Sequence, residues 1–202
     1  MVGIVDYGVG NLFSLTSSFA AIGSEVVVSS DADILRTADR LILPGVGAFR
    51  DAKAKLSESG LDKFVKEEIG KGKPLLGICL GMQMLFDKSF EYGEYEGLGL
   101  IPGNIVPMEG KIRKDLKIPH IGWNPLFFKK QSKLFKYIRE GDCTYFVHSY
   151  YADTCPDYVT SVAEYDIEVT ASVERGNVFG CQFHPEKSGE VGLLILKAFL
   201  EI

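Results

Sequence analysis

Cys79 stands in the run Gly77-Ile-Cys-Leu-Gly81, which directly follows the apolar residues Pro74-Leu-Leu76. A nucleophile with a glycine two positions away on each side, at the end of a buried strand, is typical of a sharp strand-to-helix turn. A helix that begins at Leu80 would aim free backbone N–H groups at the sulfur and favour both a thiolate and a developing oxyanion. Cys79 alone could equally be a buried packing residue, the usual fate of an intracellular cysteine.

A histidine and a carboxylate that could complete the chemistry lie about a hundred residues further along, in Phe183-His-Pro-Glu186. A packing cysteine has no need of glycine on both sides, whereas a strained turn does. His184 as the base and Glu186 as its orienting acid would supply the remaining parts of a Cys-His-acid system. The sequence therefore predicts nucleophilic catalysis by Cys79, which requires the sulfur and the His184 imidazole to meet in the fold.

Composition indicates one enzyme domain over residues 1–202, because 46% of the residues are hydrophobic and 24% are charged. No apolar stretch approaches the roughly 20 residues that span a bilayer, and residues 1–6 resemble a first strand rather than a basic signal peptide. We therefore expect a cytoplasmic chain that does not enter a membrane. The four cysteines form no C-x-x-C pair and no histidine stands at metal-ligand spacing, so neither disulfides nor a metal or other cofactor is predicted.

The net charge of −5 argues against nucleic-acid binding, but it conceals an uneven distribution of charge. Residues 111–139 carry nine Lys or Arg residues against one acid, Asp115. A solvated basic face is the simpler interpretation, and a patch for a protein partner or a phosphorylated ligand is the other. The sequence leaves both open.

Short apolar runs rich in β-branched and aliphatic residues alternate with helical patterns in the first half of the chain, which is typical of buried parallel strands. The expected strands are residues 2–6, 25–28, 40–43 and 74–78, with helical patterns over 11–22 and 51–69. Between residues 98 and 180, shorter alternating segments suggest antiparallel strands, among them 104–108, 144–147 and 159–163, before a helix over 189–202. The predicted fold is α/β: an open, mostly parallel, doubly wound sheet flanked by helices, with an additional smaller antiparallel sheet.

Two glycine clusters follow predicted strands, Gly8-Val-Gly10 and Pro44-Gly-Val-Gly47. Both miss the G-x-G-x-x-G spacing, so nucleotide binding is only weakly indicated. The second cluster ends a strand that should neighbour the one before the cysteine, and ligands bind beyond the carboxyl ends of strands in such sheets. It is either an ordinary tight turn or a turn whose Val46 or Gly47 amide joins the Leu80 amide as an oxyanion hole.

Three segments together resemble the class I, triad-type glutamine amidotransferases: Pro44-Gly-Val-Gly47, Gly77-Ile-Cys-Leu-Gly-Met-Gln83 and Gln182-Phe-His-Pro-Glu-Lys-Ser188. In that family Cys, His and Glu hydrolyse glutamine to glutamate and ammonia. Two further segments, Pro119-His-Ile-Gly-Trp-Asn124 and Tyr145-Phe-Val-His-Ser-Tyr150, are similar to the glutaminase subunits of imidazole glycerol phosphate synthase, which serve histidine biosynthesis. The resemblance covers essentially the whole chain.

The resemblance implies that Cys79 attacks the side-chain amide of glutamine and forms a glutamyl thioester, with His184 as the base and Glu186 as its orienter. It also implies a partner, a separate (β/α)₈-barrel cyclase subunit that forms a heterodimer with this chain and receives the ammonia. Free glutaminase activity should be low, because the turn at residues 45–47 would adopt its productive orientation only with partner and acceptor bound.

The resemblance and the motif spacing give a set of binding residues. Those expected around the substrate are Gly45, Gly47, Gly81, Gln83, Glu91, His148, Ser149 and Tyr150. By resemblance, Glu91 would contact the α-amino group, while Ser149 and Tyr150 would bind the α-carboxylate through backbone amides. His120 is expected to be structural or interfacial. The residues expected to face the cyclase are Asn11, Trp123, Tyr145 and Lys187.

Other functions and roles remain open. A free-standing γ-glutamyl or peptide hydrolase would use the same triad but turn over without any partner. Another amidotransferase subunit, such as that for anthranilate, would respond to a different synthase. A noncatalytic scaffold of this fold would resist covalent labelling by a glutamine-like electrophile, although it has no reason to keep the whole triad. Gln83 could be a helix-surface amide, and Trp123 a half-buried core aromatic.

Overall fold

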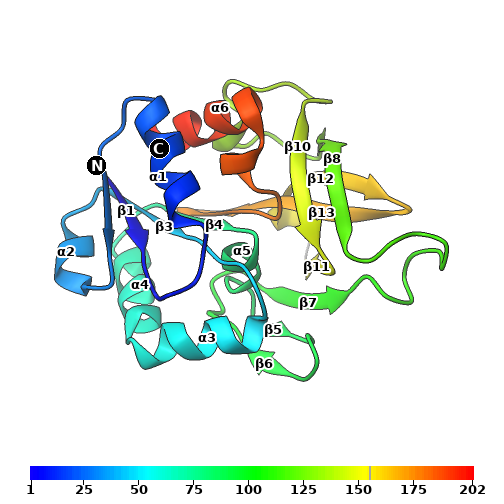
Figure 1. Ribbon diagram of the computed structural model, residues 1–202, viewed down its shortest axis with the longest axis horizontal. Helices are drawn as coiled ribbons and strands as arrows, with labels where there is room; N and C mark the ends of the chain where they lie inside the picture. Colours follow the sequence, from blue (N-terminus) through cyan, green and yellow to red (C-terminus); the bar gives the residue numbers. More distant parts are fainter. Residues whose placement is uncertain (155) are drawn as a thin grey trace.

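The computed structural model describes residues 1–154 and 156–202. Its centre is an eight-stranded sheet (Figure 1) made, in spatial order, of β2 (Val26–Ser29), β1 (Val2–Val5), β3 (Arg40–Leu43), β4 (Leu75–Ile78), β14 (Val178–Cys181), β13 (Ile167–Arg175), β12 (Val159–Tyr165) and β9 (Phe127–Phe128). The strands from β2 to β14 run parallel to one another, and β13, β12 and β9 continue the sheet in antiparallel pairs.

Helices cover both faces of this sheet. One face carries α1 (Leu12–Ala21) and α6 (Gly189–Leu200), and the other carries α3 (Phe49–Glu58), α4 (Leu61–Gly70) and the short α5 (Leu80–Gln83) (Figure 1). Strand β3 shows why: Leu41 and Leu43 pack in the cluster with α3 and α4, while Ile42 packs in the cluster with α1 and α6. None of the helices in the described ranges is long and apolar enough to cross a membrane.

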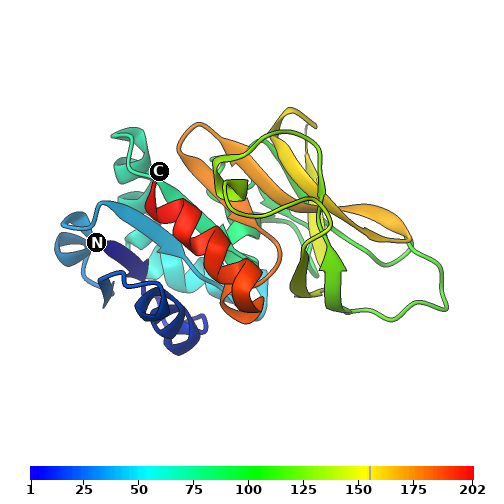
Figure 2. The ribbon, with the colours of Figure 1, turned by 90° about the horizontal axis from the view of Figure 1, so that it is seen from above.

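Two smaller sheets lie beside the large one. The first pairs β8 (His120–Pro125) with β10 (Cys143–His148), and the second contains β11 (Tyr150–Thr154), β7 (Gly103–Pro107), β5 (Lys88–Ser89) and β6 (Tyr95–Glu96). Only β5 and β7 pair in parallel among these strands. Figure 2 shows β8 and β10 at the end of the molecule away from α1. The predicted α/β class is confirmed, and its smaller antiparallel part is divided between two sheets.

The helical pattern over residues 51–69 forms two helices rather than one. α3 ends at Glu58 and α4 begins at Leu61, because Gly60 between them takes a φ of +74°, a left-handed conformation that suits glycine. The pattern over residues 11–22 does form α1, and the Asn11 side chain caps it by accepting a hydrogen bond from the Ser14 N–H. The five-residue α2 (Ala32–Arg36) is too short to show a helical period in the sequence.

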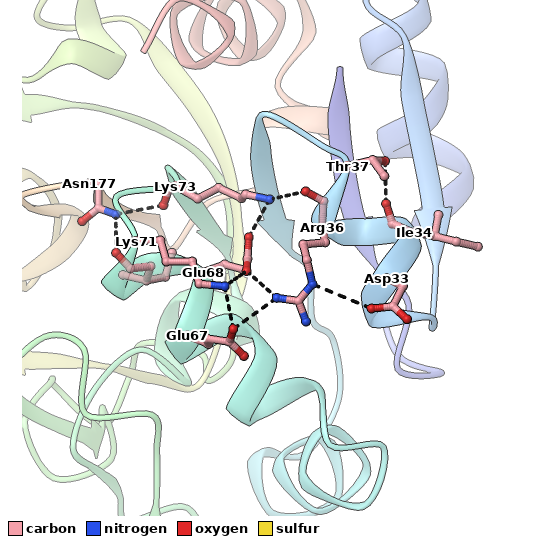
Figure 3. Close-up of polar contacts among 10 residues, drawn as sticks. Asp33, Ile34, Arg36, Thr37, Glu67, Glu68, Lys71, Lys73 and Asn177 are labelled. Carbon is pink, nitrogen blue, oxygen red and sulfur yellow. Dashed lines mark hydrogen bonds and ion pairs between the residues drawn. The ribbon is translucent and has the colours of Figure 1, made fainter.

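A charged cluster joins α2, α4 and the segment before β4 (Figure 3). At its centre is the Glu68 carboxylate, 4% exposed, which lies 2.8 Å from an Arg36 nitrogen, 2.9 Å from Lys71 Nζ and 2.8 Å from Lys73 Nζ. Burial raises the pKa of Glu68, but the hydrogen bonds and charges of Lys73 and Lys71 outweigh it and lower the pKa to about 2. Glu68 is therefore a carboxylate at neutral pH that holds one cation from α2 and two from the segment between α4 and β4.

The basic segment at residues 111–139 is partly neutralised by acids from elsewhere in the chain. Arg113 lies 3.2 Å from Asp166, and Lys129 lies 2.6 Å from Glu168. Lys136 is also paired with the Glu201 carboxylate. These ion pairs support the interpretation of a solvated face.

Candidate active site

A strained turn presents Cys79 directly after β4. Cys79 has φ +53° and ψ −110°, and it is one of three non-glycine residues with positive φ among those described. Such a backbone conformation costs about 1–3 kcal/mol and persists only where its surroundings hold it. Two backbone bonds do so here: the Cys79 N–H donates to the Cys181 carbonyl at 2.8 Å, and the Gln83 N–H donates to the Cys79 carbonyl at 3.0 Å. α5 then begins at Leu80, as the sequence predicts.

The glycines around this turn are required by close backbone contacts. A Cβ at Gly81 would lie 1.8 Å from the Leu43 carbonyl oxygen, and one at Gly77 would lie 2.8 Å from the Gly81 oxygen. A Cβ at Gly45 would lie 2.8 Å from the Gly81 nitrogen. The turn after β4 and the turn after β3 are therefore packed backbone to backbone, which only residues without a Cβ allow.

The C-terminal motif comes to the same edge of the sheet. β14 is the parallel neighbour of β4, with Cys181 opposite Ile78, so the residues that follow the two strands leave the sheet side by side. The His184 N–H donates to the Tyr145 carbonyl at 2.9 Å, and His184 Nδ1 lies 2.8 Å from Glu186 Oε1. The side chains of both His184 and Glu186 are buried.

The charge state of His184 follows from these neighbours. Burial lowers the pKa of His184, but its hydrogen bonds and charge interactions with Cys79 and Glu186 outweigh burial and raise the pKa to about 9. His184 Nε2 has no hydrogen-bond partner among the described residues. The imidazole therefore holds a proton at neutral pH on a nitrogen that is free to give it to a bound molecule.

A cavity of about 710 Å³ adjoins the turn, and both Cys79 and His184 line it. The other predicted site residues that line it are Asn11, Val46, Gly47, Leu80, Gln83, Glu91, His148, Ser149, Tyr150 and Lys187. Gly45 and Gly81 do not line it, since they are packed against each other, and Glu186 lies behind His184. Trp123 and Tyr145 also lie outside the lining. The fold thus gathers predicted site residues from six separate stretches of sequence around one space.

Two polar groups contact the sulfur of Cys79. Gln182 Nε2 lies 3.7 Å from Sγ, and the Val147 carbonyl oxygen lies 3.9 Å from it. Gln182 in turn accepts a 3.0 Å hydrogen bond from Gln83 Nε2, which also donates to the Tyr150 carbonyl at 3.0 Å. Gln83 therefore lies on the cavity wall, as predicted from its spacing, but its amide nitrogen is bonded to protein groups.

Glu91 makes a contact that the sequence did not indicate. Its Oε2 accepts a 2.6 Å hydrogen bond from the Phe49 N–H at the start of α3. Burial raises the pKa of Glu91, although the Phe49 N–H opposes the rise. Glu91 therefore lines the cavity and also accepts a hydrogen bond from the end of the turn that follows β3.

His148, which lines the cavity, forms a buried pair with His120. His148 Nδ1 lies 2.9 Å from the Tyr150 carbonyl oxygen, and His148 Nε2 lies 3.1 Å from His120 Nδ1. His120 Nε2 lies 2.8 Å from Asn124 Oδ1. Burial and the neighbouring His120 lower the pKa of His148 to about 3, so it is neutral at working pH and unsuited to be the base.

Comparison with known proteins decides the family. A family model described as "Glutamine amidotransferase class-I" matches residues 3–201. The chain belongs to the class I glutamine amidotransferases. The resemblance carried by its motifs is therefore confirmed, and the protein is an amidotransferase enzyme.

Relatives and solved structures place this amidotransferase more closely. It is 51% identical to the "Imidazole glycerol phosphate synthase subunit HisH" of Caldanaerobacter subterraneus subsp. tengcongensis, over 100% of this chain and 98% of that protein. It is 50% identical to the protein of the same name from Geobacillus sp., over 100% of this chain and 97% of that one. A crystal structure of a glutamine amidotransferase shares the fold with a TM-score of 0.77 at 19% identity, over 99% of this chain and 97% of that one.

The residues expected to face a partner of this amidotransferase lie around one surface. Trp123 on β8 stands opposite Tyr145 on β10, with ring centroids 6.0 Å apart, and Lys187 Nζ lies 6.0 Å from the Tyr145 ring. Trp123 is 55% exposed, so it is not a half-buried core aromatic. Asn11 lies at the cavity lining on the N-cap of α1.

Several residues of the amidotransferase site were not predicted from the sequence. Those that line the cavity are Gly10, Tyr92, Pro119 and Val147. Behind the lining, Tyr7 donates a hydrogen bond to the Pro44 carbonyl, and Gln182 donates to Cys79. The sequence held two signals for the residues behind the lining. Gln182 is a polar residue two positions before His184, and Tyr7 directly precedes the glycine cluster Gly8-Val-Gly10.

Proposed function

We propose that this amidotransferase is the glutaminase subunit of an imidazole glycerol phosphate synthase. It would hydrolyse glutamine and pass the ammonia to a (β/α)₈-barrel cyclase in histidine biosynthesis. The observation that carries the proposal is that Cys79 and His184 line one cavity while Glu186 holds the imidazole. The identity of about half of all residues with two proteins named as HisH subunits supports the choice of synthase.

The first half of the reaction releases ammonia. The Cys79 thiolate attacks the side-chain carboxamide carbon of glutamine, and backbone amides at Leu80 and at Val46 or Gly47 hold the negative oxygen. His184, protonated because its pKa is raised to about 9, gives its proton from Nε2 to the amide nitrogen. The C–N bond breaks, ammonia leaves, and a glutamyl thioester remains on Cys79.

The second half restores the enzyme. Neutral His184 takes a proton from water, the resulting hydroxide attacks the thioester carbon, and the C–S bond breaks. Cys79 leaves as a thiolate, His184 is again an imidazolium, and the new carboxyl group of glutamate gives its proton to solvent as the product is released. Glu186 supports the charged imidazole at each stage through the contact between its carboxylate and Nδ1.

The use of ammonia requires a partner. Ammonia released into water at neutral pH would become ammonium and lose its nucleophilicity, so it needs a sheltered path to a second active site. The surface of β8 offers a docking site, because Trp123 and Ile121 are 55% and 57% exposed there. The functional unit is proposed to be a cytoplasmic heterodimer with the cyclase.

The test is covalent labelling with 6-diazo-5-oxo-norleucine, a glutamine-like electrophile, followed by peptide mass spectrometry. We expect one adduct on the Cys79 peptide, formed faster when the barrel cyclase and its ligand are present, and no adduct on Cys79→Ser. An adduct on another cysteine would refute the nucleophile. Glutamine turnover by the isolated chain as fast as by the complex with acceptor would instead indicate a free-standing hydrolase.

A further inference from the structure

The side chain of Gln182 contacts the nucleophile from a place that substrate does not reach. It is fully buried at the end of β14, it is not part of the cavity lining, and its Nε2 lies 3.7 Å from Cys79 Sγ. The Gln182 N–H donates to the Ala171 carbonyl at 2.8 Å, which fixes the backbone from which this side chain extends.

The two polar contacts of the sulfur act in opposite senses. An amide N–H can only donate, so the Gln182 contact is strongest when Cys79 is a thiolate. A carbonyl can only accept, so the Val147 oxygen at 3.9 Å suits a neutral S–H and disfavours a thiolate. Gln182 therefore offsets Val147 in favour of the reactive form, in addition to the charged His184 imidazole.

The orientation of the Gln182 amide is set by a chain of hydrogen bonds. The Tyr150 carbonyl can only accept, so the nitrogen of the Gln83 amide has to face it. The second hydrogen of that nitrogen then points at Gln182 Oε1, 3.0 Å away. With its oxygen committed to Gln83, Gln182 has to turn its own nitrogen toward the sulfur of Cys79.

The Tyr150 carbonyl, at which this series of hydrogen bonds begins, is itself held in place. The Tyr150 carbonyl has a second partner, His148 Nδ1 at 2.9 Å, which in turn is backed by His120 through the 3.1 Å contact between their rings. The amide of Gln83 consequently meets a carbonyl that is already held in place. Ser149 and Tyr150 also line the cavity, so one segment serves both the cavity wall and the amide chain.

We propose that Gln182 is a positioning residue for Cys79, and that the Tyr150 carbonyl and Gln83 orient its amide so that an N–H always faces the sulfur. Only the expected effect on glutaminase kinetics rests on the proposed function; the positioning role itself does not. Reactivity of Cys79 toward a simple alkylating agent depends on the thiolate and not on glutamine, so it tests the positioning role independently.

The experiment compares the full chain with Gln182→Met, which keeps the volume and removes the donor, and with Gln182→Glu, which keeps the shape and presents only acceptors. Alkylation of Cys79 by iodoacetamide at about pH 7 is followed by peptide mass spectrometry, which separates it from the other cysteines. Loss of a hydrogen bond to a charged group should slow Cys79 alkylation about tenfold in Gln182→Met, and Gln182→Glu should be slower still. If Gln182→Met does not fold, Gln182→Asn takes its place. Its side chain is one methylene too short to reach the sulfur, so it too should slow the alkylation of Cys79.

Thr160→Val is the matched control, because Thr160 is fully buried in β12 and its hydroxyl contacts Ser172 rather than the site. It should lose stability without a change in the alkylation rate. A folded Gln182→Met chain that alkylates Cys79 at the wild-type rate would overturn the proposal, as would an equal slowing in Thr160→Val.

Kinetics with the cyclase complete the test. Because Gln182 does not line the cavity, Gln182→Met should lower the glutaminase kcat about tenfold and change KM for glutamine less than about twofold. A rise in KM with an unchanged kcat would contradict the positioning role. If the wild-type complex hydrolysed no glutamine while the alkylation rates changed as expected, the proposed function would fall and the role of Gln182 would stand.

Discussion

The Tyr7 hydroxyl donates a 2.6 Å hydrogen bond to the carbonyl oxygen of Pro44, at the start of the turn that bears Val46 and Gly47. Burial and the charge of Cys79 raise the pKa of Tyr7, so the phenol keeps its proton throughout the working pH range. The bond fixes the first peptide of the turn proposed to supply an oxyanion donor, and Gly10 lies close to the Pro44 ring.

Tyr7→Phe removes this donor and leaves a buried carbonyl without a partner. We expect the free energy of unfolding, measured with urea, to fall by about 1–2 kcal/mol. The glutaminase kcat of the complex should fall about threefold to tenfold, because a less well fixed turn stabilises the oxyanion less. Tyr165→Phe is the control, since it also loses a hydroxyl bonded to a carbonyl, that of Lys117, at an exposed place. Equal kcat losses in both variants would show that Tyr7 has no special role.

The raised pKa of His184 is directly measurable, because the chain has only three histidines. The imidazole should titrate near 9 rather than near 6.5 in an NMR titration, and His148 should stay neutral throughout. Since the folded-state pKa is the higher one, the stabilising contribution of His184 is complete below about 6.5 and is lost as the pH rises through about 9. Glutaminase activity should decline over the same upper range.

Glu186→Gln should move the His184 pKa downward. The substitution removes a negative partner that raises the pKa, while burial, which lowers it, remains. Glu190→Gln, an exposed neighbour on α6, controls for the loss of one negative charge. A titration of His184 at the same pH in Glu186→Gln and in the wild type would contradict the assignment of Glu186 as its partner.

The Glu68 cluster should dominate the acid sensitivity of the fold (Figure 3). Glu68→Gln leaves three cations without their buried carboxylate and should cost about 3 kcal/mol at neutral pH in urea unfolding. The folded-state pKa of about 2 lies below the usual 4.5, so this contribution is present above about 4.5 and fades as the pH falls through about 2. Glu67→Gln, half exposed beside it, should cost much less than Glu68→Gln, because solvent screens its ion pairs. Similar losses for both variants would contradict this ranking.

Gly81→Ala should disrupt the turn that bears the nucleophile. The added Cβ would lie 1.8 Å from the Leu43 carbonyl oxygen, so α5 has to move away from β3. We expect a loss of more than about 3 kcal/mol in thermal unfolding, together with most of the glutaminase activity. Gly70→Ala, where nothing lies within 4 Å of the added Cβ, should be neutral or stabilising. A tolerated Gly81→Ala would mean that the two turns can separate freely.

Trp123→Ala should weaken the proposed heterodimer without affecting the isolated chain. Loss of an exposed aromatic anchor typically raises Kd about tenfold to a hundredfold, which titration calorimetry with the cyclase would measure. Ile34→Ala, 45% exposed on α2 at the other end of the molecule, should leave Kd unchanged. Full affinity in Trp123→Ala would place the cyclase elsewhere.

Local chemistry explains which parts of the site could be predicted from the sequence. The turn at Cys79 was predictable because close backbone packing demands glycine on both sides of it, at Gly77 and Gly81. The parallel strands of the first half were predictable because a strand buried on both faces is apolar at every position, as β4 is. The break between α3 and α4 at Gly60 was not predictable. The helical period of the sequence continues through it, although the Gly60 backbone takes a left-handed conformation.

Contacts between distant residues explain what could not be predicted. Gln182 stands in the motif with His184, but its partner Cys79 is 103 positions away, and nothing local shows which way its amide turns. The Tyr7 hydroxyl likewise meets a carbonyl 37 positions away. The joining of β5 and β6 to β7 and β11 in one sheet depends on the parallel pairing of β5 with β7, which the alternation of side chains does not specify.

The central place of β14 has a consequence for synthesis on the ribosome. β14 is translated after every other strand of the described sheet, yet it sits between β4 and β13 in the middle of that sheet. Until it emerges from the exit tunnel, β4 is an open strand edge that invites aggregation, and the nucleophile has no base. A premature stop codon before Val178 would therefore leave the β4 edge open and remove His184 at the same time.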